Sequence, residues 1–350
     1  MPPSFSQQPH DAYRYSRHII TALLIAALVL VATYAGLRNW LQQPLPLQQN
    51  TLIVFERGSS IQALSRQLQA KGLLQQPWLF RLWTRSQGID TRLKAGEYDI
   101  APGETLAGLL DKMLRGEVKQ YSITLVEGWN FRQMMQAIAR HPQIRHTLDD
   151  ATVDTIMAQL SLADTAQPLH GEGQFLPDTY YIHRDTSDRE LLIRAHRALQ
   201  QTLRHYWKNR QPDLPLKTPY EALILASIIE KETAVAEERA LIAGVFINRL
   251  RKNMRLQTDP TVIYGMGERY QGDIRFRDLR RDTPYNTYTR HGLPPTPIAM
   301  AGRAAIEAAT QPAATDYLFF VASSDGSGRH LFSTTLEQHE KKVDIHQRGK

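Results

Sequence analysis

The sequence predicts an α+β protein with a single N-terminal transmembrane helix, a small βααβ module and a larger α+β domain. Three observations predict it: an uncharged apolar segment near the start, strand-to-helix corners that recur after it, and a long remainder in which strands and helices alternate. The length of 350 residues allows two or three domains, and 42% hydrophobic content is ordinary for folded chains.

The transmembrane helix is predicted over residues 19–37, which contain no charged residue and are long enough to cross a bilayer. Arg14 and Arg17 precede this segment and only Arg38 follows it closely, so the positive-inside rule places the N-terminus in the cytoplasm and the bulk of the chain outside. A cleaved signal peptide is the competing interpretation. The apolar run is longer than a typical signal, and residues 33–35 make a poor cleavage site, so we expect an uncleaved anchor.

Residues 42–49 are rich in Pro and Gln and predict a linker, after which folding resumes near Thr51. Three strand-to-helix corners follow, each with a glycine for the turn and a residue that can cap the next helix. The glycine and cap pairs are Gly58 with Ser60, Gly103 with Thr105, and Gly128 with Asn130. The corner at residues 103–106, after a strand that bears Tyr98, resembles the start of LysM modules, which are βααβ units that grip N-acetylglucosamine polymers. The resemblance implies a glycan-gripping module, and a plain packing domain is the alternative.

The larger domain is predicted to contain four long helices, at residues 131–140, 190–206, 219–233 and 237–251, and a β-hairpin formed by residues 318–322 and 331–333. We expect the chain after Glu337 to be polar and frayed. The predicted parts are a cytoplasmic start (1–18), the transmembrane helix (19–37), the linker (38–50), the LysM-like module (51–118), the larger domain (119–340) and the polar tail (341–350).

Composition and missing motifs exclude several chemistries. The absence of cysteine removes thiol catalysis and cysteine-ligated zinc. The twelve histidines form no pair of metal-ligand spacing, and neither a serine-hydrolase elbow nor a phosphate-binding glycine loop is found, so we expect no metal and no cofactor. A net charge of +7 suits an anionic polymer or a lipid surface, and no nucleic-acid-binding motif is present. Carboxylate chemistry remains.

The best-defined helix leads directly to two carboxyl groups. Thr218 is a good N-cap, Pro219 suits the first helical position, and Glu221 completes a capping box. At helical spacing Glu232 shares a face with the bulky residues 225, 228 and 229, whereas Glu230 follows smaller ones. Because burial disfavours the charged form of a carboxyl group, Glu232 is the better candidate for an acid, and Glu230 for an outer or surface role.

The region from residue 225 to 298 resembles the YceG-like family of endolytic murein transglycosylases. The strings that carry the resemblance are ASIIEKETA (226–234), VFINRL (245–250), RLQTDPTVIYG (255–265), YNTY (285–288) and GLPP (292–295). A thinner likeness covers nearly the whole chain, including residues 125–128 and 177–180. Residues 290–291 and 296–297 are local departures from the pattern.

The resemblance implies that Glu232 is the catalytic acid and base, and that the strings around it line the substrate cleft. The implied cleft residues are Gln257, Thr258, Asp259, Tyr264, Tyr285, Asn286 and Tyr288. Turn capping is an equally good interpretation of Gln257, Asp259 and Asn286, and plain packing is an equally good one of the three tyrosines.

The implied activity is cleavage of the bond between N-acetylmuramic acid and N-acetylglucosamine within nascent glycan strands, leaving 1,6-anhydro ends and ending strand elongation. The implied place is the inner membrane, with the catalytic part in the periplasm and penicillin-binding proteins as partners. Two alternatives remain: a glycan hydrolase that pairs Glu232 with Asp259 or Glu230 as the second carboxylate, and a glycan-binding scaffold of the cell-wall synthesis machinery that catalyses nothing.

Overall fold

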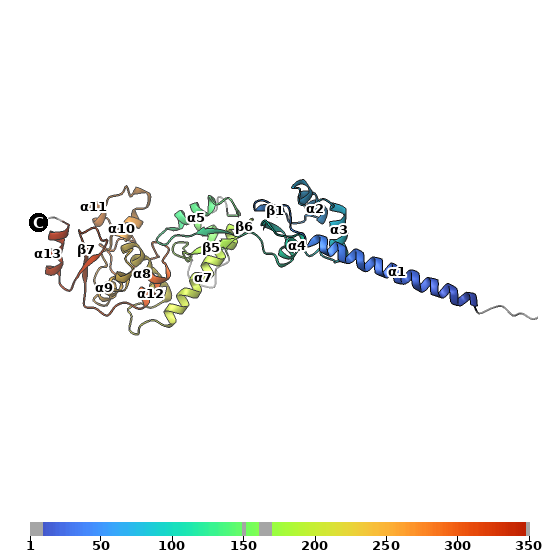
Figure 1. The fold of residues 1–350 in the computed structure, drawn as a ribbon. Coiled ribbons are helices and arrows are strands. Elements are labelled where there is room, and N and C mark those ends of the chain that lie inside the picture. The colour runs from blue at the N-terminus through green and yellow to red at the C-terminus, as the bar shows by residue number, and fades with distance from the viewer. Residues whose placement is uncertain (1–9, 149–151, 161–169, 348–350) are drawn as a thin grey trace, which may run out of the picture. The chain divides into compact units, whose positions relative to one another are not determined.

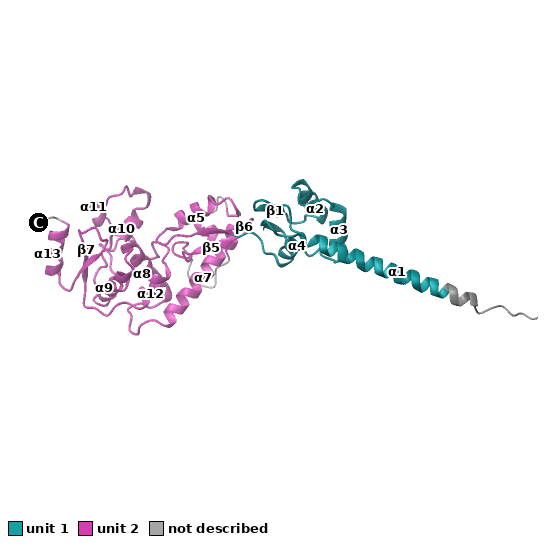
Figure 2. Cartoon of the chain, viewed as in Figure 1, with its two compact units in different colours: residues 1–120 teal, residues 121–350 magenta. Residues whose placement is uncertain are grey.

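The computed structural model describes residues 10–148, 152–160 and 170–347. The chain forms two compact units, Met1–Gln120 and Tyr121–Lys350 (Figure 1, Figure 2). The two units are built around separate hydrophobic cores and are described in turn.

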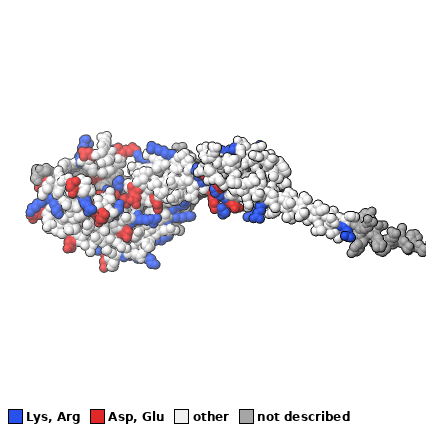
Figure 3. All heavy atoms as spheres, viewed as in Figure 1, with Lys and Arg blue, Asp and Glu red and all other residues white. Residues whose placement is uncertain are grey.

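The first unit begins with the long helix α1 (His10–Leu41). Its segment Ser16–Leu41 is apolar and exposed along most of its length, and Figure 3 shows it almost free of charge. By length and composition this helix could cross a membrane, which is consistent with an anchor. It runs four residues beyond the predicted end at residue 37, because Leu41 is buried in the core of the unit.

The predicted linker is not a free spacer. Leu45 is 6% exposed, its backbone N–H donates to the carbonyl of Glu104 at 2.7 Å, and Pro44 forms a β-bridge with Thr105. The prediction rested on the Pro and Gln content of this segment and did not take account of Leu45, which is buried in the same core as Leu41.

The rest of the first unit has the order βααβα. Its elements are β1 (Thr51–Phe55), α2 (Ile61–Ala70), α3 (Pro77–Ser86), β2 (Gly96–Ile100) and α4 (Leu106–Arg115). Strands β1 and β2 pair antiparallel, with Thr51 opposite Ile100. Ser60 and Thr105 cap α2 and α4, as predicted. The residues that suggested a LysM start, however, follow β2 rather than β1, so they do not lie at the first corner of the βααβ order.

The described residues of the second unit form three small sheets and most of the helices. Its sheets pair β3 (Tyr121–Thr124) with β5 (Thr179–Ile182), β4 (Ile144–Arg145) with β6 (Thr186–Ser187), and β7 (Phe319–Ala322) with β8 (His330–Ser333). Its helices are α5 (Phe131–Ala139), α6 (Val153–Gln159), α7 (Asp188–Lys208), α8 (Pro219–Glu232), α9 (Arg239–Arg251), α10 (Asp259–Met266), α11 (Phe276–Arg280), α12 (Arg303–Thr310) and α13 (Leu336–His346), with single 3₁₀ turns at Ala236–Glu238 and Gly267–Arg269.

Helix α8 is the centre of the larger core. Thr218 caps it by accepting the N–H of Glu221 at 3.2 Å, and every residue from Ala222 to Ile229 is buried against α7, α9 and α12. Thr233 is extended and ends the helix, one residue earlier than predicted. The helix thus carries Glu232 out of the core on its last turn.

The prediction of a frayed tail is wrong for the described residues up to 347. Helix α13 packs on β7 and β8, with the ring of His339 stacked on Phe319 at 5.2 Å between centroids. Thr335 caps the helix, and the Lys342 amine donates to the carbonyl of Phe332 at 2.5 Å. The polar composition of this segment gave no sign of these contacts, because their partners come together only once the hairpin is folded.

Candidate active site

A pocket of about 490 Å³ opens where α8 ends, between α9, α10 and the β7–β8 hairpin. Its lining includes Glu232, Gln257, Asp259, Tyr288, Phe320 and His330. Polar groups from four chain segments, at residues 232, 257–259, 288 and 330, therefore converge on one hollow, and convergent polar groups of this kind are typical of ligand sites.

Glu232 is partly exposed to this pocket, and its Oε1 accepts a hydrogen bond from the Thr258 hydroxyl. Burial raises the pKa of Glu232 to about 7; the Thr258 hydrogen bond opposes this rise, and the nearby Asp259 carboxylate adds to it. At neutral pH this carboxyl group can therefore both give and take a proton.

Thr258 is held firmly in place. Its backbone N–H donates to the Thr287 hydroxyl at 3.1 Å, and its carbonyl accepts from the Thr261 hydroxyl at 2.7 Å. The hydroxyls of Thr261 and Thr287 are 2.9 Å apart, and all three threonines are buried. This network fixes the hydroxyl that faces Glu232.

Asp259 and Tyr288 form a second polar pair in the pocket, because the Tyr288 hydroxyl donates to Asp259 Oδ1 at 2.5 Å. Burial, followed by the Asp259 hydrogen bond, raises the pKa of Tyr288. The phenol therefore keeps its proton and remains a hydrogen-bond donor.

Arg249 belongs to the string VFINRL, and the sequence analysis assigned it no role. In the structure it is a buried hydrogen-bond donor beside Glu232. It is 7% exposed, with Nε donating to the carbonyl of Leu318 at 2.6 Å and Nη1 donating to that of Leu256 at 2.7 Å and to Gln257 Oε1 at 3.4 Å. Its positive charge also opposes the burial-driven rise in the pKa of Glu232. The available signal was an arginine in the apolar helix string 245–250.

Asn286 does not line this pocket. It is 1% exposed, and its side-chain amide donates to the carbonyls of Asp278, Leu279 and Arg281 at 2.7–3.3 Å. These bonds hold the end of α11, so here the turn-capping interpretation describes the residue and the prediction of a cleft contact is corrected.

Tyr264 and Tyr285 also lie outside the pocket lining and pack edge to face, with centroids 4.8 Å apart. Tyr285 bonds to the Thr296 hydroxyl at 2.9 Å, and the Tyr264 hydroxyl donates to Glu172 at 3.2 Å. The packing interpretation thus describes both rings, and neither contacts the pocket of Glu232.

Glu172 is a buried carboxyl group that the sequence analysis missed. It is 4% exposed and accepts the backbone N–H of Phe131 at 3.0 Å, and burial raises its pKa to about 7. A signal existed: an acidic residue between Gly171 and Gly173, both of which lie too close to neighbouring side chains for a Cβ.

Glu230 points away from the pocket, and its Oε2 accepts the backbone N–H of Gly302 at 2.9 Å. Its side chain is 6% exposed and lies 4.0 Å from the Arg239 guanidinium. Burial raises its pKa as well. Of the predicted outer or surface role, the surface alternative is therefore corrected: the Glu230 side chain is largely buried and ties α8 to the start of α12.

His330 was also missed, because it lies in the hairpin far along the chain. Its Nδ1 is 2.8 Å from Glu238 Oε2, and its backbone N–H also donates to that carboxylate. Among the residues that the structure describes, no three His, Asp or Glu side chains are grouped so as to hold a metal ion.

Residues 53–345 match the model of the YceG-like family, a range that includes residues 53–120 of the first unit and most of the residues that line the pocket of Glu232. This chain belongs to the YceG-like family. The endolytic murein transglycosylase of Bacillus subtilis is 33% identical over 81% of each chain. The endolytic murein transglycosylase of Streptococcus pneumoniae D39 is 27% identical. That match covers 95% of this chain and 65% of the pneumococcal protein.

A solved structure supports the same family fold. The crystal structure of a yceG-like protein from Listeria monocytogenes is 31% identical, with a TM-score of 0.52, and the match covers 84% of this chain and 99% of that chain. The mixed α+β architecture of this YceG-like chain therefore has a relative among experimental structures.

Proposed function

We propose that this protein is a membrane-anchored endolytic murein transglycosylase. It cleaves the β-1,4 bond between N-acetylmuramic acid and N-acetylglucosamine within nascent glycan strands, leaves 1,6-anhydro ends, and thereby ends strand elongation. The family and the names of two relatives support the choice of substrate. The observation that carries the chemistry is Glu232, a carboxyl group with a pKa of about 7 at the wall of a pocket.

A single carboxyl group suffices for this reaction. Protonated Glu232 donates its proton to the bridging oxygen as the bond from C1 of the muramic acid to that oxygen breaks, and the substrate's N-acetyl group stabilises C1. Glu232 then accepts the proton of the 6-hydroxyl group as that oxygen forms its bond to C1. No water is consumed, and the acid is restored.

The residues around Glu232 either orient that side chain or bind the glycan in this proposal. Thr258 keeps Glu232 Oε1 in one orientation, and Gln257, Asp259 and Tyr288 present polar groups to the sugars. We place the N-terminus in the cytoplasm and the second unit in the periplasm, beside the glycan-polymerising penicillin-binding proteins. The first unit would grip the strand as a LysM-like module.

One observation favours hydrolysis as a second candidate. Asp259 lines the same pocket as Glu232, and a glycosidase needs two carboxyl groups, one of which activates water or attacks the sugar. The Tyr288 hydroxyl already donates to Asp259 Oδ1 and so competes with water or the sugar for that oxygen, which argues against that role.

Product analysis separates these two functions. We expect the full chain in detergent micelles, incubated with uncrosslinked glycan strands in ¹⁸O-labelled water, to generate 1,6-anhydro ends that contain no ¹⁸O, because the attacking oxygen belongs to the sugar. Mass spectrometry of the new ends is the measurement. Reducing muramic ends that carry ¹⁸O would establish hydrolysis instead.

A further inference from the structure

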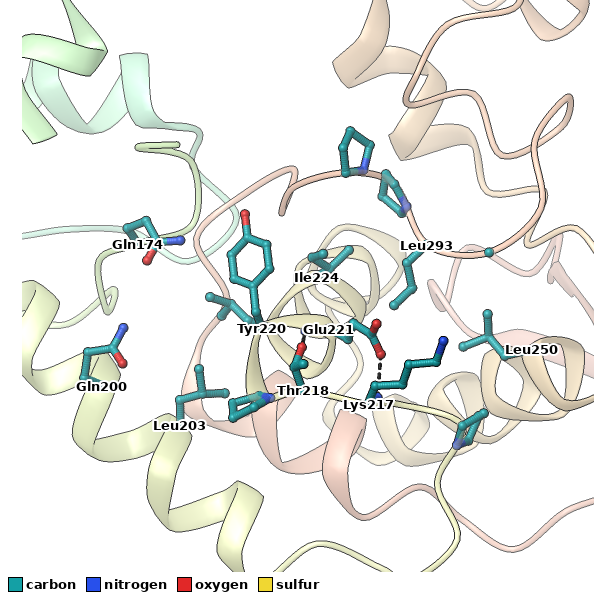
Figure 4. Close-up of a pocket in the computed structure, with 16 residues that line it drawn as sticks. Gln174, Gln200, Leu203, Lys217, Thr218, Tyr220, Glu221, Ile224, Leu250 and Leu293 are labelled. Atoms are coloured by element: carbon teal, nitrogen blue, oxygen red, sulfur yellow. Dashed lines mark hydrogen bonds between the residues drawn. The ribbon is translucent and has the colours of Figure 1, made fainter. Parts of the chain in front are cut away.

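A second, larger pocket of about 790 Å³ lies at the opposite end of α8 (Figure 4). Its walls come from α7, the first turns of α8 and the loop at residues 292–295. Helix α8 has 14 residues, so its two ends are about 20 Å apart at 1.5 Å per residue. The pocket is therefore distinct from the site of Glu232.

The pocket contains a buried amide without a partner. Gln174 is 1% exposed, and its side-chain Nε2 makes no hydrogen bond. Figure 4 shows this amide directed toward Tyr220. An unpaired buried N–H is unfavourable, and such a group in a native structure calls for an explanation such as an absent ligand.

The backbone holds Gln174 in this position. Its carbonyl accepts from His196 Nδ1 at 2.9 Å. The preceding Gly173 has φ of 72°, and a Cβ there would lie 2.4 Å from Pro297. The backbone that carries the amide is thus fixed beside the pocket.

The remaining walls are mostly apolar, and their two charged residues balance one another. Tyr220 lines the pocket together with the apolar side chains of Leu203, Ile224 and Leu293. The charged lining residues are one cation, Lys217, and one anion, Glu221, whose Oε2 accepts the backbone N–H of Lys217 at 2.5 Å. A neutral ligand with both hydrogen-bonding and apolar parts fits such a lining best.

We propose that this pocket binds an N-acetylated sugar ring. The Gln174 N–H donates to the acetamido carbonyl, the apolar wall takes the methyl group, and the Tyr220 ring packs on the face of the sugar. Burial raises the pKa of Tyr220 to about 12, so its hydroxyl also remains a donor. The segment Gly292–Pro295 lines this pocket, and Tyr288, a few residues earlier, lines the pocket of Glu232. One stretch of chain therefore contributes to both pockets. The choice of a glycan as the natural ligand rests on the proposed function.

The test uses the absence of native cysteine. Pro295 is exposed at the rim, so Pro295→Cys carrying an environment-sensitive fluorophore reports on this pocket alone. In the full chain in detergent micelles, short β-1,4-linked N-acetylglucosamine oligomers should give a saturable change in fluorescence. Adding Gln174→Met should weaken this binding by about five- to tenfold, the effect of one lost hydrogen bond. It should also leave the thermal midpoint unchanged or raised, because it removes an unpaired amide.

Gln67→Met is the matched control, since Gln67 also has an unpaired buried amide atom but belongs to the first unit. It should leave the fluorescence titration unchanged. The assignment is overturned if the oligomers give no saturable signal, if Gln174→Met binds as tightly as its parent, or if only acidic stem peptides produce the signal. Adding Glu232→Gln should leave binding intact while abolishing cleavage, so failure of the proposed reaction and failure of this site are distinguishable.

Discussion

Replacing Glu232 with Gln is expected to lower the rate of glycan cleavage by about 10³–10⁴-fold, near the upper end of what general acid–base catalysis contributes, because one group serves both steps. The amide keeps the size of the carboxyl group and can still accept the Thr258 hydrogen bond, so the fold should be retained. The measurement is the initial rate of strand cleavage by the full chain in detergent, with thermal unfolding recorded in parallel.

Glu230→Gln is the matched control for this variant, on the same helix and two residues away. Its amide oxygen can still accept the Gly302 N–H, and the residue does not line the pocket, so cleavage should change by less than about tenfold. Equal loss in the two variants would mean that the effect of Glu232→Gln comes from disturbing α8 rather than from removing an acid.

Replacing Arg249 with Met is expected to destabilise the second unit by about 3–5 kcal/mol. The change leaves buried carbonyls at Leu256 and Leu318 without their charged donor, and such losses are among the most costly single substitutions. Chemical denaturation of the full chain, monitored by a probe in the second unit, measures the free energy of unfolding.

Arg249→Lys separates charge from geometry. Lysine keeps the positive charge but lacks the planar fork that reaches several acceptors at once, so it should recover only part of the lost stability. Full recovery by lysine, or a loss below about 1 kcal/mol in Arg249→Met, would contradict the role given to the guanidinium.

Local signals in the sequence predicted the elements that are formed locally. The Thr218 cap and Pro219 mark the start of α8 within the chain itself, and the glycine-rich turn between the two apolar runs marks the β7–β8 hairpin. Helix α13 was not predicted, because it is stabilised by the stacking of His339 on Phe319 and by the hydrogen bond from Lys342 to the carbonyl of Phe332. Both contacts require the folded hairpin.

The site was only partly predictable for the same reason. Spacing placed Glu232 over an apolar helix face, but α8 is buried around nearly its whole circumference, so the choice between its two glutamates depends on the neighbours each one meets. Glu230 meets the backbone of Gly302, whereas Glu232 meets Thr258 and a pocket walled by the hairpin. Those neighbours are distant in sequence, as is the Leu318 carbonyl that accepts from Arg249.

The pH dependence of kcat/KM tests the central claim most directly, because it reports the ionisation of the free enzyme. Glu232 must be protonated to begin the reaction, so kcat/KM should fall as the pH rises through about 7. In Thr258→Val the loss of the hydrogen bond that favours the ionised form should move this fall to higher pH, which assigns it to Glu232. An activity that falls near the ordinary glutamate pKa, or a fall that Thr258→Val leaves unmoved, would contradict the account.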